Sequence, residues 1–135
     1  MDNTLLIWKY LKPLLTQNQE LTKYINAAYM YPCAAVLTDT HYPFLIYRRE
    51  SITPEYTKHI PNASGWVNNI SISVTVVSDN YDESAYIANL VRNILENARI
   101  RNDEIKIMDI ELASSYESYN DDAYQQNLIF NLTAV

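Results

Sequence analysis

The chain has 135 residues, 16 acidic and 10 basic side chains, and a formal net charge of −6. This balance argues against a nucleic-acid-binding surface, because phosphate recognition depends on clustered Lys and Arg. The sequence contains one glycine and one cysteine, which excludes a glycine-rich phosphate loop and an internal disulfide framework.

The length predicts a single domain over residues 1–135. The chain starts with an acidic segment that has no long apolar core, so we expect no signal peptide. Its longest apolar run, residues 27–37, is interrupted by Pro32 and is shorter than the roughly 20 residues that cross a bilayer. We therefore expect a soluble protein that does not contact a membrane.

The first predicted element is a helix over residues 4–24. Pro13 would remove a hydrogen bond from its interior, so we expect either a kink there or a break near residues 16–19 with a second short helix after it. Its apolar side chains form a stripe that is typical of core packing. They are Leu5, Leu6, Trp8, Leu11, Leu15 and Leu21.

Two strands are predicted next, over residues 28–32 and 43–52. In the second, Phe44 and Ile46 alternate with side chains of the other face. Residues 53–65 contain two prolines and the single glycine and predict a long loop. Loops of this length in a compact domain are usually functional or ordered by a partner.

A strand followed by a helix organises the chain. Residues 66–78 alternate apolar with small polar side chains, which predicts a strand with one buried face. Residues 82–98 place apolar side chains along one side, which predicts an amphipathic helix. Between them, Asp79 or Asp82 is expected to cap the helix. These acids with Glu83 could instead hold a hard cation, but their place before a helix favours capping.

The last two predicted strands cover residues 104–115 and 123–135, with a polar turn over residues 114–122 between them. The apolar positions change parity between Ile107 and Met108, which predicts a β-bulge. The resulting order predicts an α+β fold. We expect an antiparallel sheet of about five strands, packed against the N-terminal helix and the long helix after the third strand.

The sequence shows no constellation for catalysis. His41 and His59 lie in separate predicted loops without partners at ligand spacing, and no nucleophile signature surrounds Cys33. We therefore expect no catalytic residue, no metal and no cofactor. Twelve tyrosines remain to be explained, and they indicate either a protein interface or a mixture of core and surface positions.

Three ordered stretches carry a family resemblance. They are residues 42–51 followed by Pro54 and Lys58, then residues 74–96, then residues 119–128 before the last strand. Together they resemble small tail-completion or tail-terminator proteins of tailed bacteriophages, including related head–tail joining proteins.

This resemblance implies a structural virion protein rather than an enzyme. It implies a subunit that assembles with its own copies into a closed ring, with six-fold symmetry favoured and twelve-fold possible. The ring would lie at the tail end or the head–tail junction and contact portal, connector or tail-tube proteins. DNA would pass through without specific binding, and assembly would take place in the cytoplasm of the bacterial host.

A closed ring needs two different surfaces on each subunit. We expect the strand end and loop around Arg48 to reach a neighbour, and the two acidic turns to accept it, although all these side chains could simply be solvated. The candidates are Arg48, Arg49, Glu50, Tyr56 and Lys58 on the first surface and Asp79, Tyr81, Asp82, Tyr119, Asp121 and Asp122 on the second.

The alternative is a small α+β ligand-binding or enzymatic accessory subunit of a cellular complex. Such a protein would need a pocket with convergent polar groups and perturbed titrations, and the sequence predicts no such set.

Overall fold

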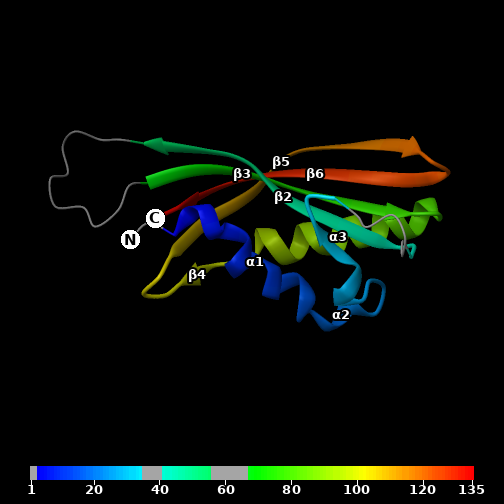
Figure 1. Cartoon of the computed structure of the whole chain (residues 1–135), viewed down its shortest axis with the longest axis horizontal. Helices are drawn as coiled ribbons and strands as arrows, with labels where there is room; N and C mark the ends of the chain where they lie inside the picture. The colour runs from blue at the N-terminus through cyan, green and yellow to red at the C-terminus, as the bar shows by residue number, and fades with distance from the viewer. Residues whose placement is uncertain (1–2, 35–40, 56–66) are drawn as a thin grey trace, which may run out of the picture.

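A computed structural model describes residues 3–34, 41–55 and 67–135. Its centre is a six-stranded sheet in the order β1-β2-β3-β6-β5-β4 (Figure 1). β1 runs parallel to β2, and the other neighbouring pairs are antiparallel. The strands are β1 Met30–Pro32, β2 Phe44–Glu55, β3 Val67–Ser78, β4 Ile100–Arg101, β5 Lys106–Asn120 and β6 Ala123–Ala134.

The predicted α+β class is confirmed, but the sheet is mixed and has six strands instead of about five antiparallel ones. The direction of β1 was not predictable, because hydrophobic alternation carries no information about which way a strand runs. β4 lies between the predicted helix over residues 82–98 and the predicted strand over residues 104–115, and its two residues are too few to show any period.

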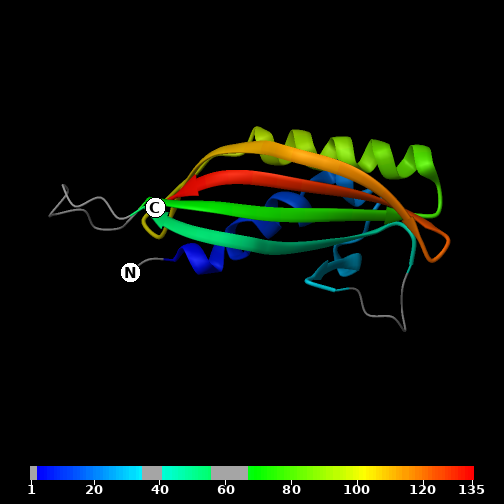
Figure 2. The same cartoon turned by 90° about the horizontal axis from the view of Figure 1, so that it is seen from above.

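The helices lie on one side of the sheet, as Figures 1 and 2 show. They are α1 Ile7–Thr16, α2 Gln19–Thr22 and α3 Tyr81–Glu96. No helix of the described residues covers the opposite side, which we call the open face. None of these helices is long and apolar enough to cross a membrane, as far as the described ranges go.

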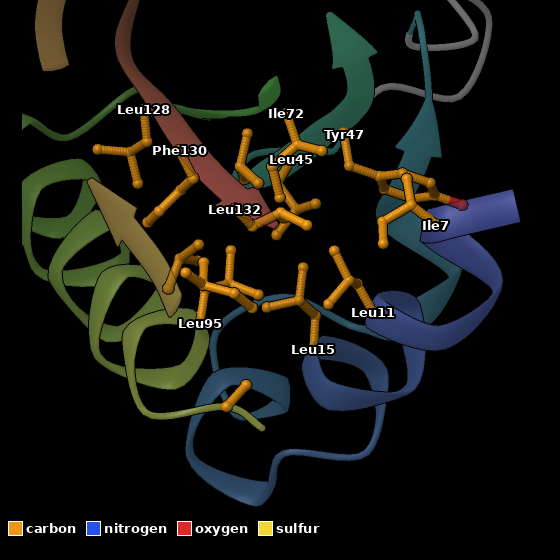
Figure 3. Close-up of a cluster of buried hydrophobic side chains, with 14 of the residues drawn as sticks. Ile7, Leu11, Leu15, Leu45, Tyr47, Ile72, Leu95, Leu128, Phe130 and Leu132 are labelled. Atoms are coloured by element: carbon orange, nitrogen blue, oxygen red, sulfur yellow. The ribbon is translucent and has the colours of Figure 1, made fainter. Parts of the chain in front are cut away.

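One apolar core fills the space between the sheet and the helices (Figure 3). Ile72 of β3, Phe130 of β6 and Leu95 of α3 are fully buried in it. The remaining strand positions alternate between this core and the open face, as the pleat requires. The open face therefore carries many small polar side chains, which include Ser51, Thr53, Asn69, Ser71, Ser73, Thr75, Asn127, Asn131 and Thr133. Near β1 the same face carries a second, smaller apolar cluster of Phe44, Val77 and Ala123, with Ile46 packed against it.

The N-terminal helix breaks where the second sequence alternative placed the break. α1 ends at Thr16 and α2 begins at Gln19, whereas Pro13 lies within α1. The side-chain oxygen of Asn18 accepts hydrogen bonds from the backbone of Glu20 and Leu21 at 3.1 and 3.0 Å, which caps α2. The break therefore has a local cause in the sequence.

The predicted core stripe of this helix is only partly correct. Leu11, Leu15 and Leu21 are buried, but Leu5 and Leu6 are 66% and 48% exposed. The reason is that a 3-10 turn over Thr4–Leu6 opens the element and turns both leucines outward.

β5 contains the predicted bulge and a second one. Its register against β6 shifts between Met108 and Glu111 and again between Leu112 and Ser114. β5 also continues to Asn120, through most of the segment expected to be a polar turn. The turn itself has only two residues, Asp121 and Asp122, with positive φ angles of 54° and 60°. That geometry belongs to a tight type I′ hairpin, which Asp tolerates.

Candidate assembly surfaces

Two acidic segments meet at one end of the sheet. Figures 1 and 2 both place the start of α3 beside the β5–β6 turn. The Tyr81 hydroxyl donates to Glu117 Oε1 at 3.1 Å, and the Tyr81 and Tyr124 rings lie 5.5 Å apart. The Tyr119 ring lies 4.9 Å from Tyr124. The second predicted surface is therefore one continuous feature, which we call the hairpin end. Its members are Asp79, Tyr81, Asp82, Glu117, Tyr119, Asp121, Asp122 and Tyr124.

The sequence builds the α3 side of the hairpin end by capping. The Asn80 side chain accepts a hydrogen bond from the Glu83 backbone at 3.0 Å, so Asn80 is the cap and the prediction of Asp79 or Asp82 was wrong. The Ser78 hydroxyl donates to Glu83 Oε1 at 2.9 Å. Asp79 and Asp82 remain exposed on either side of Tyr81.

Two tyrosines of the hairpin end, Tyr81 and Tyr119, have raised pKa values and stay neutral at physiological pH. The hydrogen bond to Glu117, together with the charge of that carboxylate, raises the pKa of Tyr81 above 10.0. Partial removal from solvent, followed by the nearby Asp122 charge, raises the pKa of Tyr119. Both rings are well exposed, at 44% and 57%. The hairpin end thus presents aromatic area within an acidic surface, and no Lys or Arg occurs in residues 78–84 or 116–126.

The first predicted surface lies on β2, where Arg48 Nε contacts Glu50 Oε1 at 2.6 Å. The buried Ser73 hydroxyl donates to the same Glu50 oxygen at 2.7 Å. These two hydrogen bonds, that of Ser73 first, lower the pKa of Glu50 below its ordinary value of 4.5. Arg49 Nη1 donates to the Leu5 carbonyl at 2.8 Å, on the helical side of the sheet.

The two predicted surfaces do not meet within the chain. β3 and β6 lie between β2 and β5 in the sheet. Each chain therefore offers them at separate places, as a head-to-tail contact requires. Tyr56 and Lys58 lie outside the described residues.

The sequence predicted the alternation in β3 but missed the open face as a feature. A hollow of about 470 Å³ lies on this face, lined by residues that include Ser51, Asn69, Glu111 and Asn131. β3 and β6 place small polar side chains at most of their open-face positions, and β2 does so at Ser51 and Thr53, so the signal was present but distributed over three strands.

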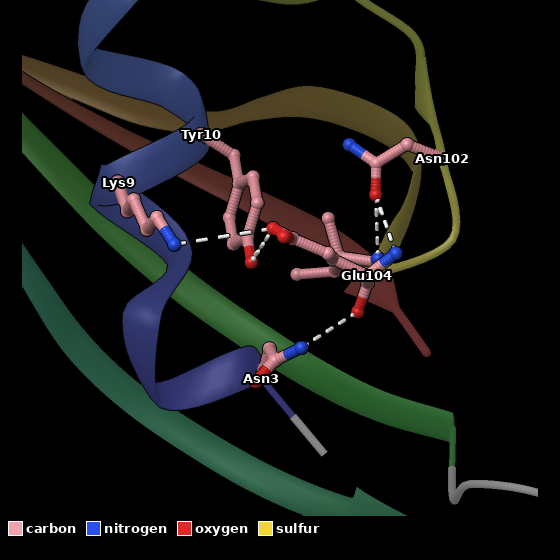
Figure 4. Close-up of polar contacts among 6 residues, drawn as sticks. Asn3, Lys9, Tyr10, Asn102 and Glu104 are labelled. Atoms are coloured by element: carbon pink, nitrogen blue, oxygen red, sulfur yellow. Dashed lines mark hydrogen bonds and ion pairs between the residues drawn. The ribbon is translucent and has the colours of Figure 1, made fainter. Parts of the chain in front are cut away.

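A second feature that the sequence missed ties the N-terminal segment to the turn between β4 and β5 (Figure 4). Tyr10 donates its hydroxyl hydrogen to Glu104 Oε2 at 2.9 Å, and Lys9 Nζ lies 3.9 Å from the same oxygen. The Asn3 side chain donates to the Glu104 carbonyl at 2.9 Å. The Asn102 side chain accepts from the backbone of Glu104 and Ile105 and holds the turn.

The described residues include no group of three or more His, Cys, Asp or Glu side chains that could hold a metal ion. His41 lies with its ring 4.9 Å from the Tyr29 ring, and Cys33 is exposed.

Comparison with known proteins finds a similar fold but no similar sequence. No model of a known protein family matches the chain, and no curated protein is similar to it in sequence. Among solved structures, a chain described as "Virion of native gene transfer agent (GTA) particle" matches with a TM-score of 0.74. The match covers 90% of this chain and 88% of that chain, at 13% identity. This chain therefore has the fold of a chain in a gene transfer agent virion.

Proposed function

We propose that the protein is a structural subunit of a phage-like virion, and that its copies form a closed ring at the tail end or the head–tail junction. The observation that carries this proposal is the fold match to a gene transfer agent virion over 90% of the chain. The resemblance of residues 42–51, 74–96 and 119–128 to tail-completion and tail-terminator proteins points to the same class.

The two surfaces support assembly with other copies. Arg48 and Arg49 lie on β2, while the hairpin end is acidic and rich in exposed tyrosine. Tyrosine is favoured at interfaces because it combines apolar area with a polar tip. Opposite charges across such a contact set its register more than its affinity. A six-fold ring is the favoured assembly. A twelve-fold ring would be closed by the same contact between the two surfaces.

The negative net charge of the chain supports a ring through which DNA passes without being bound. A net charge of −6 gives phosphates little to bind. In this proposal the ring contacts portal, connector or tail-tube proteins and surrounds the DNA path, and the chain performs no catalysis.

A genetic experiment tests this role. Deleting the gene for this chain from the phage or particle genome that encodes it should yield heads and tails that fail to join, or tails without the terminal ring. Adding the purified chain to such lysates should restore joined particles. Complete particles in the absence of the chain would contradict the proposed function.

A further inference from the structure

Within the described part of the chain, both edge regions of the sheet lack a neighbouring strand over most of their length. β1 pairs only with Leu45–Tyr47 of β2, and β4 pairs only with Lys106 and Ile107 of β5. No strand in the described part of the chain pairs with the outer edge of β2 over residues 48–55 or of β5 over residues 108–120. Unpaired strand edges are templates for another strand, and proteins that remain monomeric usually protect them.

The two edges differ in how many residues are regular enough to pair with another strand. On β5, Glu96 Oε1 of α3 accepts the Leu112 backbone N–H at 3.1 Å, and two bulges precede Ser114. Residues 114–120 then pair with β6 without a further shift and contain no proline. On β2, a bulge lies between Arg49 and Ser51, and Pro54 lacks a donor. The regular stretch on β2 is therefore residues 51–53.

We propose that the outer edge of β2 in one copy pairs with the outer edge of β5 in the next copy, so that one sheet continues from subunit to subunit. This inference rests on the proposed function, because it specifies how the ring closes. β2, β3, β6 and β5 are antiparallel in succession, so β2 and β5 run in opposite directions. A side-by-side continuation of the sheet makes their pairing antiparallel. It is also a heterologous contact, which is the kind that generates rings.

Charge selects β2 over a second β5 as the partner. Residues 114–122, which comprise the free edge of β5 and its turn, carry Glu117, Asp121 and Asp122 and no cation. Pairing two such edges about a two-fold axis would bring like charges together, which is unfavourable. The free edge of β2 carries two arginines and two glutamates, and the side chain of Arg48 is 56% exposed.

Hydrogen–deuterium exchange tests the pairing on the full chain. The outward-facing amides of residues 51–53 and 114–120, followed in peptides covering residues 48–55 and 114–120, should exchange at least about tenfold more slowly in the assembled ring than in the dilute monomer, because they gain partners. Rings with unchanged exchange in both peptides would overturn the edge pairing and leave the proposed function standing. A chain that stays monomeric at every concentration, also with purified connector or tail-tube protein added, would overturn both.

Disulfide trapping identifies the partner strand. In a Cys33→Ser background, Ser51→Cys is combined with Ser114→Cys or with Ser118→Cys; all three positions lie on the open face. Three strand spacings, roughly 14 Å, separate β2 from β5 within one chain, beyond the roughly 7 Å that a disulfide spans, so any bridge joins two copies.

Oxidation should give a ladder of covalent multimers on a non-reducing gel, ending at the copy number of the ring. Ser71→Cys with Ser114→Cys is the matched control, because Ser71 lies beside Ser51 on the interior strand β3, and it should give no ladder. Covalent dimers from Ser114→Cys or Ser118→Cys alone would place β5 against β5 and overturn the proposal.

Discussion

Reversing the charge of Arg49 should weaken assembly and leave the subunit folded. Arg49 lies beside the bulge of β2, and its Nη1 donates to the Leu5 carbonyl at 2.8 Å. Arg49→Glu removes this exposed hydrogen bond, which costs about 0.5–1.5 kcal/mol of unfolding free energy. A domain with a core of this extent tolerates such a loss, since typical stabilities are about 5–15 kcal/mol.

Relative to the free energy of one subunit contact, the effect on assembly should be larger than the effect on folding is relative to the unfolding free energy. An exposed ion pair contributes about 0.2–1 kcal/mol, and reversing one partner replaces that attraction with a repulsion of similar size. The change is about 0.5–2 kcal/mol for each subunit contact. At about 1.4 kcal/mol for a factor of ten, the Kd of one contact should rise roughly 2- to 30-fold.

Sedimentation velocity over a concentration series measures this change, and circular dichroism checks the fold. Lys23→Glu is the matched control, because it makes the same change in net charge at an exposed position just after α2. The expected result is weaker assembly for Arg49→Glu alone. Assembly of Arg49→Glu equal to that of the unmodified chain would remove Arg49 from the interface and refute the charge argument.

Three further predictions concern the subunit itself. Asn80→Ala removes the cap of α3 and should lower the unfolding free energy by about 1 kcal/mol in urea denaturation, whereas an unchanged midpoint would contradict the capping role. Phe130→Ala, at a fully buried site, should cost about 3–5 kcal/mol, and a loss below 1 kcal/mol would mean that the core is not packed as described. The lowered pKa of Glu50 means that its ionised form stabilises the fold above about pH 4.5, and that this contribution is lost as pH falls through the folded-state pKa. Ser73→Ala should weaken this acid sensitivity in thermal melts at pH 3–7, and an identical profile would show that the Ser73 hydroxyl has no part in it.

The sequence predicted the elements with a strong period and missed those without one. The alternation from Ile70 to Val76 and the helical spacing from Ile87 to Leu95 correctly placed β3 and α3. The second half of β5 was expected to be a turn because its side chains are exposed on both faces, so apolar alternation is absent. Only pairing with β6 makes that segment a strand, and pairing is a tertiary property.

The second candidate surface was predicted as two separate acidic turns, and the structure joins them. The sequence could not show that Tyr81 and Glu117 are hydrogen-bonded, because that contact depends on the length of the β5–β6 hairpin. It also could not show that the Ser73 hydroxyl donates to Glu50. That contact joins β3 to β2 and depends on their register, which shifts at the bulge between Arg49 and Ser51.

The central claim, that the chain is a ring-forming virion subunit, is tested most directly by native mass spectrometry across concentration, with negative-stain images of the same sample. A ring-forming subunit should give one discrete oligomer with the mass of a closed ring, six copies being favoured, and ring-shaped particles with a central opening. A chain that stays monomeric at every concentration, and also when purified connector or tail-tube protein is added, would rule out the ring.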